Sequence, residues 1–428
     1  MSPRPWFSPV LEHIGGVPIR ELARQFGTPL YVYDAETILR RREQLRRFPV
    51  VRYAQKACSN LAVLALLRRQ GVVLDAVSAG EIVRALRAGY PAQGDPPPVV
   101  YTADIFDRPA LELVARHGIH VNCGSPDMMD QLAQAAGGQE ITLRINPGFG
   151  HGHSQKTNTG GEQSKHGIWH EQLPECLRRA ERLGHRVVGL HVHIGSGTDL
   201  EHLAQVCQAM EQLAEQAGPH LRWISAGGGL PVPYRPEDPE LDLQRYHQLW
   251  EQTCRRIEQR LGHPVRLEIE PGRFLVAESG YLITEIRAVK QQGSRRYWLV
   301  DAGFNDLARP VMYGAYHPMS VCRRDGSQEA EPAEEVAVGG PLCESGDIFT
   351  QEEGGFVVSR RLPRAGVGDL LVIGVAGAYG AVMGSNYNSK PLAPEVLVLE
   401  GTPHLVRRRQ GWEELFAGEQ VPEVLAAE

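Results

Sequence analysis

Four short stretches of this sequence carry residues that could do chemistry together. A lysine, Lys56, lies in the apolar run VRYAQKA, and a histidine, His193, lies in VVGLHVHIG. A lysine in an apolar run is costly unless it is paired, reaches solvent or serves as a nucleophile. Glycines at the end of a strand let backbone N–H groups approach an anion such as a phosphate. The stretches WISAGGG and RLEIEPGR add such a glycine run and a carboxylate, with Gly227, Gly228, Gly229, Glu270 and Arg273.

A lysine, a flat ring, a phosphate cradle and a carboxylate are together the parts of a pyridoxal 5'-phosphate site. Lys56 would form the Schiff base with the cofactor, helped by burial that lowers the pKa of its amine. Glu270 beside the pyridine nitrogen would keep that nitrogen protonated, so that the ring accepts the electrons of a carbanion. Each feature alone also has a structural explanation, such as a paired lysine or a tight glycine turn.

Two histidine pairs, His151 with His153 and His191 with His193, have the H-x-H spacing that metal-dependent barrel hydrolases use. A metal site also needs a ligating carboxylate from another strand end, and no further histidine or cysteine set completes either pair. We therefore expect no metal. We interpret His191 as a hydrogen-bonded histidine inside a barrel.

Between Val51 and Arg273 the sequence alternates β-type runs with amphipathic helical stretches. Eight such runs over about 220 residues are typical of a (β/α)8 TIM barrel, whose active site lies at the C-terminal ends of its strands. A doubly wound sheet is the alternative, but QKACSN follows the first strand where a dinucleotide fingerprint would stand. The expected strands are 51–57, 73–78, 99–103, 119–125, 141–147, 187–195, 223–229 and 266–273.

The alternation of strands and helices ends after Phe274. From there, β-rich runs between Gly/Pro turns predict a C-terminal antiparallel β-domain, either a barrel or a sandwich. An earlier run, PLYVYD at 29–34, is expected to join that domain. The predicted division is an N-terminal segment 1–35, a cofactor-binding barrel 36–275 and a β-domain 276–428. The polar, glycine-rich stretch 148–167 interrupts the barrel after its fifth strand, and we interpret it as a lid.

The bulk composition excludes several classes of protein. The 428 residues carry a formal net charge of −6, and 42% are hydrophobic and 22% charged. A nucleic-acid or membrane-surface protein would usually show basic patches, and no apolar run approaches the roughly 20 residues of a membrane span. Seven cysteines, none spaced as C-x-x-C, and an N-terminus without signal-peptide features predict reduced thiols in the cytoplasm.

Six motifs taken together resemble one known family: YAQKACSN, HVHIGSG, AGGGLPVPY, EPGRF, GPLCESGD and GAYG. The sequence resembles the alanine-racemase-like, fold type III class of pyridoxal-phosphate enzymes. Within that class it resembles the diaminopimelate decarboxylase family, in its enteric bacterial form, from PLYVYD to RRRQGWEEL. The resemblance implies decarboxylation of meso-2,6-diaminopimelate at its D-centre. The products are L-lysine and CO2, in the last step of lysine biosynthesis.

The resemblance also implies a role for each matching residue. Lys56 is the Schiff-base lysine, His193 stacks on the cofactor ring, and Glu270 contacts the pyridine nitrogen. The cofactor's phosphate is held by Ser196, Gly227, Gly228, Gly229 and the EPGR residues Glu270, Pro271, Gly272 and Arg273. The distal end of the substrate is bound by Arg273, Arg309 and Tyr313, with Glu344 on its distal ammonium and Tyr379 near both cofactor and substrate.

Cys343, in GPLCESGD, receives the role of proton donor. The resemblance implies a homodimer with shared active sites, in which this loop enters the site of the partner subunit and Cys343 reprotonates the carbanion. One departure from the wider family lies in the expected lid, where SKHGI carries His166 in place of a phenylalanine.

Physical chemistry separately favours diaminopimelate as the substrate. Its distal carboxylate suits arginines such as Arg273 and Arg309, whose planar guanidinium binds a carboxylate with two hydrogen bonds. A decarboxylase for lysine or ornithine meets an amine at that end of its substrate and would need acidic residues there instead.

An alanine racemase of the same fold would place an arginine where this sequence has Glu270. A non-catalytic pyridoxal-phosphate carrier would resemble the barrel alone.

Overall fold

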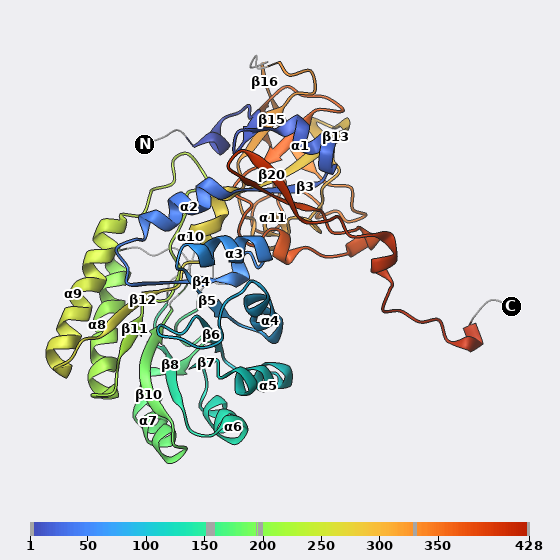
Figure 1. Ribbon diagram of the computed structural model, residues 1–428. Coiled ribbons are helices and arrows are strands. Elements are labelled where there is room, and N and C mark those ends of the chain that lie inside the picture. The colour runs from blue at the N-terminus through green and yellow to red at the C-terminus, as the bar shows by residue number, and fades with distance from the viewer. Residues whose placement is uncertain (1–3, 151–158, 194, 196–199, 328–331, 426–428) are drawn as a thin grey trace. The chain divides into compact units, whose positions relative to one another are not determined.

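The computed structural model describes residues 4–150, 159–193, 195, 200–327 and 332–425 (Figure 1). The chain divides into two compact units. We call the first the barrel unit, which comprises Thr37–Pro233 and Glu237–Ala277. The second is the β unit, which comprises Met1–Glu36, Tyr234–Pro236 and Glu278–Glu428.

The barrel unit contains a closed ring of eight parallel strands. Each strand pairs in parallel with the next, and β12 pairs with β4 to close the ring. The predicted (β/α)8 barrel is therefore confirmed. A further short strand, β9 (Ile168–Trp169), pairs with β8. The barrel strands are β4 (Val50–Ala54), β5 (Val73–Ala76), β6 (Val99–Ala103), β7 (His120–Cys123), β8 (Glu140–Asn146), β10 (Arg186–Val192), β11 (Trp223–Ser225) and β12 (Arg266–Ile269).

Helices lie around the outside of these strands (Figure 1). Side chains of Asn60, Ser78, Asp107 and Asp242 accept hydrogen bonds from the first N–H groups of four of them. No helix of the described ranges is long and apolar enough to cross a membrane. The helices are α2 (Ala35–Gln44), α3 (Leu61–Arg69), α4 (Ala79–Arg87), α5 (Arg108–His117), α6 (Pro126–Ala136), α7 (Leu173–Arg182), α8 (Leu200–Ala217), α9 (Leu243–Leu261) and α10 (Arg273–Val276).

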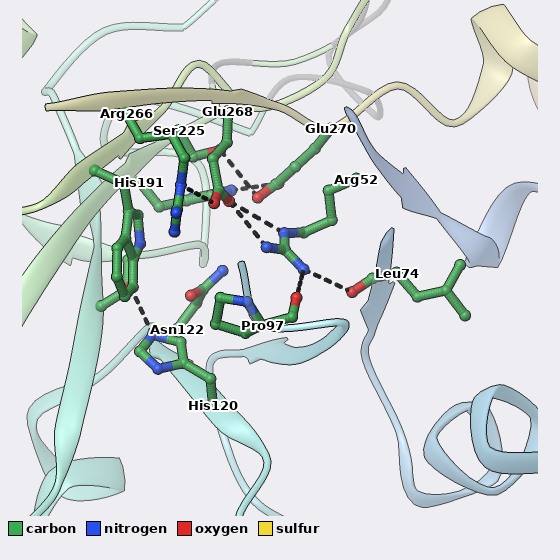
Figure 2. Close-up of polar contacts among 12 residues, drawn as sticks. Arg52, Leu74, Pro97, His120, Asn122, His191, Ser225, Arg266, Glu268 and Glu270 are labelled. Atoms are coloured by element: carbon green, nitrogen blue, oxygen red, sulfur yellow. Dashed lines mark hydrogen bonds and ion pairs between the residues drawn. The ribbon is translucent and has the colours of Figure 1, made fainter. Parts of the chain in front are cut away.

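The interior of the barrel holds charged side chains. Arg52 of β4 and Glu268 of β12 form an ion pair at 3.0 Å, with side chains only 1% and 4% exposed. Arg52 Nη1 also donates to the carbonyl oxygens of Leu74 at 3.1 Å and Pro97 at 2.8 Å (Figure 2). The buried guanidinium is therefore satisfied by a carboxylate and two carbonyl dipoles, as a charge removed from water must be.

The β unit is built on a mostly antiparallel sheet that includes a strand from near the N-terminus. β3 (Leu30–Asp34) pairs antiparallel with β13 (Gly280–Gln292) and parallel with β19 (Glu395–Leu399). The prediction that PLYVYD joins the C-terminal β-domain is therefore confirmed. The other elements are β1 (His13–Ile14), β2 (Val17–Pro18), β14 (Arg295–Val300), β15 (Met319–Cys322), β16 (Ala333–Gly339), β17 (Arg360–Pro363), β18 (Leu370–Ile373), β20 (Thr402–Arg407), α1 (Ile19–Phe26) and α11 (Arg309–Tyr313).

Strand β3 also anchors the segment that carries Arg309. Tyr31 is buried, and its hydroxyl donates to the Asp306 carbonyl at 2.6 Å. Tyr33, two residues further on, donates to a Glu395 carboxylate oxygen of β19 at 2.5 Å. The Tyr31 bond fixes the start of the turn that leads into α11, whereas the Tyr33 bond ties β3 to its neighbour β19.

Arg52→Met is expected to lower the free energy of unfolding by about 3–5 kcal/mol, because it leaves Glu268 as a buried charge without its main partner. Arg266 Nε lies 3.7 Å from the other Glu268 oxygen and does not replace the lost hydrogen bonds. Urea denaturation measures the loss. The double variant Arg52→Met/Glu268→Met should lose less than Arg52→Met alone.

The exposed pair Arg178–Glu175 is the matched control, with side chains 62% and 57% exposed. Arg178→Met should leave the urea midpoint nearly unchanged. If Arg52→Met behaved like Arg178→Met, the buried pair would contribute nothing to stability.

Candidate active site

Lys56 lies just beyond the first barrel strand. β4 ends at Ala54, and Gln55–Ala57 form a single 3-10 turn at its C-terminal end. The Ala54 N–H donates to the Pro271 carbonyl at 3.3 Å, which ties this turn to the EPGR segment. Lys56 is exposed, so the burial that we expected for it is wrong. The reason is the turn, which carries the side chain past the apolar strand to the mouth of the barrel.

Glu270 follows β12, the strand that pairs with β4. It is buried; its Oε2 lies 2.6 Å from His191 Nε2, and its Oε1 accepts a hydrogen bond from Ser225 Oγ at 3.0 Å (Figure 2). Burial alone would raise the pKa of Glu270, but contact with His191 and the charge of Arg52 lower it to about 2. Glu270 is therefore a carboxylate at neutral pH. The interpretation of His191 as a hydrogen-bonded barrel histidine is confirmed.

The glycine run after β11 is shaped by close approach of the backbone to its neighbours. Gly227 has a φ of +64°, and a Cβ there would collide with the Val192 carbonyl. A Cβ on Gly228 would collide with the Glu270 carbonyl. These contacts explain why glycine is required at both positions.

His193 is fixed by the same turn. The Gly228 N–H donates to its Nδ1 at 3.2 Å. Burial, together with the positive charge of Lys56, holds the pKa of His193 well below its ordinary value. The ring is therefore neutral, which suits stacking against another flat ring.

Asp75 of β5 is a candidate functional residue that the sequence reasoning missed. It is buried, and its pKa rises to about 8 because burial disfavours its charge and Glu270 repels it. It also interacts electrostatically with Lys56 and accepts a hydrogen bond from Thr102. The sequence does carry a signal for Asp75: side chains alternate between the two faces of the strand VLDA, and a charged residue at an inward position is unusual.

The stretch 148–167, expected as a lid, is anchored near both of its ends. Asn146 Oδ1 accepts hydrogen bonds from the Gly148 N–H at 3.1 Å and from the Gly161 N–H at 2.9 Å. His166 Nδ1 lies 2.6 Å from Asp104 Oδ2, so the residue that departs from the wider family ties the stretch to the segment after β6. The lid itself stays a prediction.

Most of the predicted cofactor-binding residues thus meet at the C-terminal ends of the barrel strands. Gly272 continues this cluster, because a Cβ there would lie 3.2 Å from the Ala54 carbonyl. Arg273 begins α10. Ser196, His151 and His153 lie outside the described residues.

Arg309 begins α11 in the β unit, and its side chain is buried. Its Nη1 lies 3.0 Å from Tyr234 Oη and 2.9 Å from His317 Nε2. His317 Nδ1 lies 3.0 Å from the Gly374 carbonyl, to which it must donate, so Nε2 carries the lone pair. Both partners are neutral and orient the guanidinium without cancelling its charge. Tyr313 ends the same helix.

Cys343 and Glu344 lie on an exposed loop of the same unit. All seven cysteines are free, and Cys343 is exposed whereas the other six are buried. Asp347 shapes the loop, since its carboxylate accepts a hydrogen bond from the Leu342 N–H at 2.8 Å. Asn388 accepts one from the Cys343 N–H at 2.7 Å. No sequence motif pointed to Asn388, which lies 45 residues further along the chain.

Tyr379, in GAYG, is half-buried and has a φ of +57°. A tyrosine rarely adopts this left-handed conformation, which costs free energy and is found most often at functional sites. The strain marks Tyr379 as a residue whose position is fixed by its surroundings.

Comparison with known proteins identifies the family. A family model for the pyridoxal binding domain of pyridoxal-dependent decarboxylases matches residues 35–277. The diaminopimelate decarboxylase of Escherichia coli K12 is 57% identical over 397 residues, which cover 92% of this chain and 94% of that relative. The Streptomyces coelicolor diaminopimelate decarboxylase is 56% identical over 409 residues, covering 96% and 93%. The chain belongs to the diaminopimelate decarboxylase family of pyridoxal-dependent decarboxylases.

Solved structures of the family agree. A crystal structure of a diaminopimelate decarboxylase has a TM-score of 0.91 and 56% identity, covering 94% of this chain and 96% of that one. The Helicobacter pylori diaminopimelate decarboxylase complexed with L-lysine has a TM-score of 0.83 and 31% identity, covering 93% and 98%. The family resemblance read from the sequence motifs is confirmed.

Pyridoxal phosphate, the cofactor of the pyridoxal-dependent decarboxylases, fits the residues at the barrel mouth. They provide the primary amine of Lys56, the charged carboxylate of Glu270 and the neutral ring of His193. These groups match the cofactor's aldehyde, pyridine nitrogen and ring in turn. The turn at Gly227–Gly229 adds backbone without side chains at the same end of the barrel, although the Gly227 and Gly228 N–H groups themselves donate to Ser225 and His193.

Asp75→Asn is expected to change how stability depends on pH. The pKa of Asp75 is raised from 3.8 to about 8 in the folded protein, so the folded state binds more protons than the unfolded chain between about pH 4 and pH 8. The unfolding free energy of the wild type therefore falls as pH rises through that window. Asp75→Asn should remove this fall and gain about 2–4 kcal/mol relative to the wild type between pH 5 and pH 8.

Urea denaturation of the cofactor-free protein at several pH values measures this difference. Asp127, whose side chain is 83% exposed, supplies the control, and Asp127→Asn should follow the wild type at every pH. Parallel pH curves for the wild type and Asp75→Asn would contradict a protonated Asp75.

Proposed function

We propose that this chain catalyses the pyridoxal-phosphate-dependent decarboxylation of meso-2,6-diaminopimelate at its D-centre, which yields L-lysine and CO2 in the last step of lysine biosynthesis. The observation that carries the proposal is a buried, charged Glu270 beside the strand end that bears Lys56. An alanine racemase of this fold has an arginine in place of Glu270, so the carboxylate favours a decarboxylase. Identities of 56–57% to diaminopimelate decarboxylases support the substrate.

When bound, pyridoxal phosphate supplies a ring that accepts the electron pair left behind by CO2. Lys56 binds the cofactor covalently, and Glu270 as a carboxylate holds a proton on the pyridine nitrogen. His193 covers one face of the ring with a neutral imidazole. The phosphate is bound by Ser196, the turn Gly227–Gly229 and the segment that contains Pro271, Gly272 and Arg273.

The distal end of diaminopimelate carries a second carboxylate and a second ammonium. Arg273, Arg309 and Tyr313 bind that carboxylate, and Glu344 binds the ammonium. The buried Arg309 supports this role, because Tyr234 and His317 orient its guanidinium without neutralising it. The strained backbone of Tyr379 supports its placement near cofactor and substrate.

Cys343 acts as the proton donor in a homodimer with shared active sites, where its loop enters the active site of the partner subunit. An exposed thiol on a loop held by Asp347 and Asn388 supports this role.

The proposed domains are an N-terminal segment 1–35 that gives a strand to the β-domain, a cofactor-binding domain 36–275 and the β-domain 276–428. Seven free thiols support a cytoplasmic location.

Turnover on meso-diaminopimelate should exceed that on L-lysine, L-ornithine and L-arginine by orders of magnitude, because only the first carries a distal carboxylate. The assay is CO2 release. Lys56→Ala should lose both activity and the visible absorbance of the bound cofactor, whereas Lys290→Ala, at an exposed position of β13, should keep both. Comparable rates on L-ornithine would reject the substrate, and unchanged absorbance in Lys56→Ala would reject the cofactor site.

Mixing two inactive variants tests the shared active site. When Lys56→Ala and Cys343→Ala chains are unfolded and refolded together, half of the dimers are hybrids, and one of the two sites in each hybrid has both residues. About a quarter of wild-type activity should therefore return. Each variant refolded alone is the control. No recovery from a mixture that forms dimers would place Cys343 in the active site of its own subunit.

A further inference from the structure

Glu270 is held from two neighbouring strands at once (Figure 2). His191, near the end of β10, places Nε2 2.6 Å from Glu270 Oε2. Ser225, the last residue of β11, donates to Oε1 at 3.0 Å. The side chains of His191 and Glu270 are 1% and 7% exposed, so water does not compete for this contact. The carboxylate is thus fixed in direction as well as in position.

The surroundings of the His191 ring show where the shared proton lies. His191 Nδ1 is buried and has no hydrogen-bond partner among the residues that the structure describes. Glu270 is ionised at neutral pH and can only accept, so His191 Nε2 carries the proton of this contact and donates it to Glu270 Oε2.

The Ser225 hydroxyl is directed in the same way. The Gly227 N–H donates to Ser225 Oγ at 3.2 Å, which leaves the hydroxyl proton for Glu270. Glu270 therefore receives one donor on each oxygen. Two donors on an ionised carboxylate favour the ionised form over the protonated one.

Other groups inside the barrel act on Glu270 in opposite directions. Arg52 attracts its charge, whereas Asp75 and Glu270 repel each other whenever both are ionised. Glu268 is neutralised by Arg52 at 3.0 Å. The titratable and charged groups that interact with Glu270 directly are Arg52 from β4, Asp75 from β5, and His191 and His193 from β10 and its end. Lys56 and Arg144 act on His193, Lys56 and Glu81 act on Asp75, and Glu268 of β12 is paired with Arg52.

We propose that His191 is a positioning residue of this active site: its Nε2–H holds Glu270 as an oriented carboxylate and sets the acid limit of the pH range in which the enzyme works. The inference rests on the proposed role of Glu270 at the pyridine nitrogen. When Glu270 takes up a proton, it no longer holds one on the cofactor, and the ring accepts electrons less well. His191 postpones that event to lower pH without touching the cofactor's reacting atoms.

Three substitutions separate this role from simple packing. Glutamine at position 191 reaches the Nε2 position with an N–H donor, asparagine is too short to do so, and leucine fills the space without a donor. In the loaded enzyme, the acid midpoint of a pH titration of cofactor absorbance should rise by about one unit or more in His191→Leu and His191→Asn. His191→Gln should stay close to the wild type. The acid limb of kcat should move with the absorbance, while KM changes little.

The cofactor-free protein gives an independent readout. The pKa of Glu270 is lowered from 4.5 to about 2, so its stabilising contribution is present above its ordinary pKa and is lost as pH falls toward 2. The difference in urea midpoint between wild type and His191→Leu should therefore shrink when pH is lowered from 7 to 4. In His191→Gln the difference should be small at both pH values.

His185 provides the matched control, because it is also buried and its Nε2 lies 2.9 Å from the Met129 carbonyl, away from Glu270. His185→Leu should leave the absorbance titration unchanged, and any change in its urea midpoint between pH 7 and pH 4 gives the effect of losing a buried histidine alone, to be subtracted from that of His191→Leu. An unchanged acid midpoint in both His191→Leu and His191→Asn would overturn the proposal. If the wild type failed to decarboxylate diaminopimelate, the proposed function would fail, yet the absorbance and stability measurements would still decide the role of His191.

Discussion

The removal of charge from water inside the barrel is the constraint on which the rest of this structure depends. Arg52, Glu268, Glu270 and Asp75 are all buried within one ring of strands, and they meet the cost of desolvation in three different ways. Arg52 and Glu268 form an ion pair supported by two carbonyl groups. Glu270 stays charged because His191 and Ser225 donate to it, whereas Asp75 binds a proton. Among the three carboxylates, Glu268 is paired with a guanidinium and Asp75 is protonated. Glu270 is charged without a guanidinium partner, and it lies at the C-terminal ends of the strands.

This arrangement explains how the fold presents one charge to a cofactor. Arg52 forms its ion pair with Glu268 and not with Glu270. Its positive charge still attracts Glu270 and helps to keep that carboxylate ionised. A protonated Asp75 reduces repulsion at the same place. Lys56 needs no burial for its role, because the 3-10 turn after β4 carries its amine to the mouth of the barrel while the Pro271 carbonyl fixes the turn. Lys56 is exposed because it lies in the turn beyond β4, whereas Glu270 is buried directly after the adjacent strand β12.

The sequence predicted the barrel well because parallel strands covered on both faces read as apolar runs at regular spacing. It also located Lys56, His193, Gly227–Gly229 and Glu270 at strand ends. It could not predict which inward side chains meet, because that depends on register around the ring. Arg52 and Glu268 are 216 residues apart in sequence, and His191 and Glu270 are 79 apart. The expected burial of Lys56 failed for a local reason, since the apolar run continues through a turn that leaves the strand.

The loop around Cys343 differs from the barrel interior because its cysteine is exposed. Six cysteines lie in the interior and need no further explanation, but Cys343 is exposed on a loop whose N–H groups are bound by Asp347 and Asn388. Asn388 has a φ of +53°, which an asparagine adopts readily, whereas the left-handed Tyr379 of the same unit is strained. Strain of this kind persists only when the surrounding structure enforces it. Leu342 and Asp347 of this loop are buried, but Cys343 itself is exposed and contributes little to packing. A thiol held at the surface is accessible to another chain, and this accessibility supports the proposed contact with a partner subunit's active site more than a role in the core.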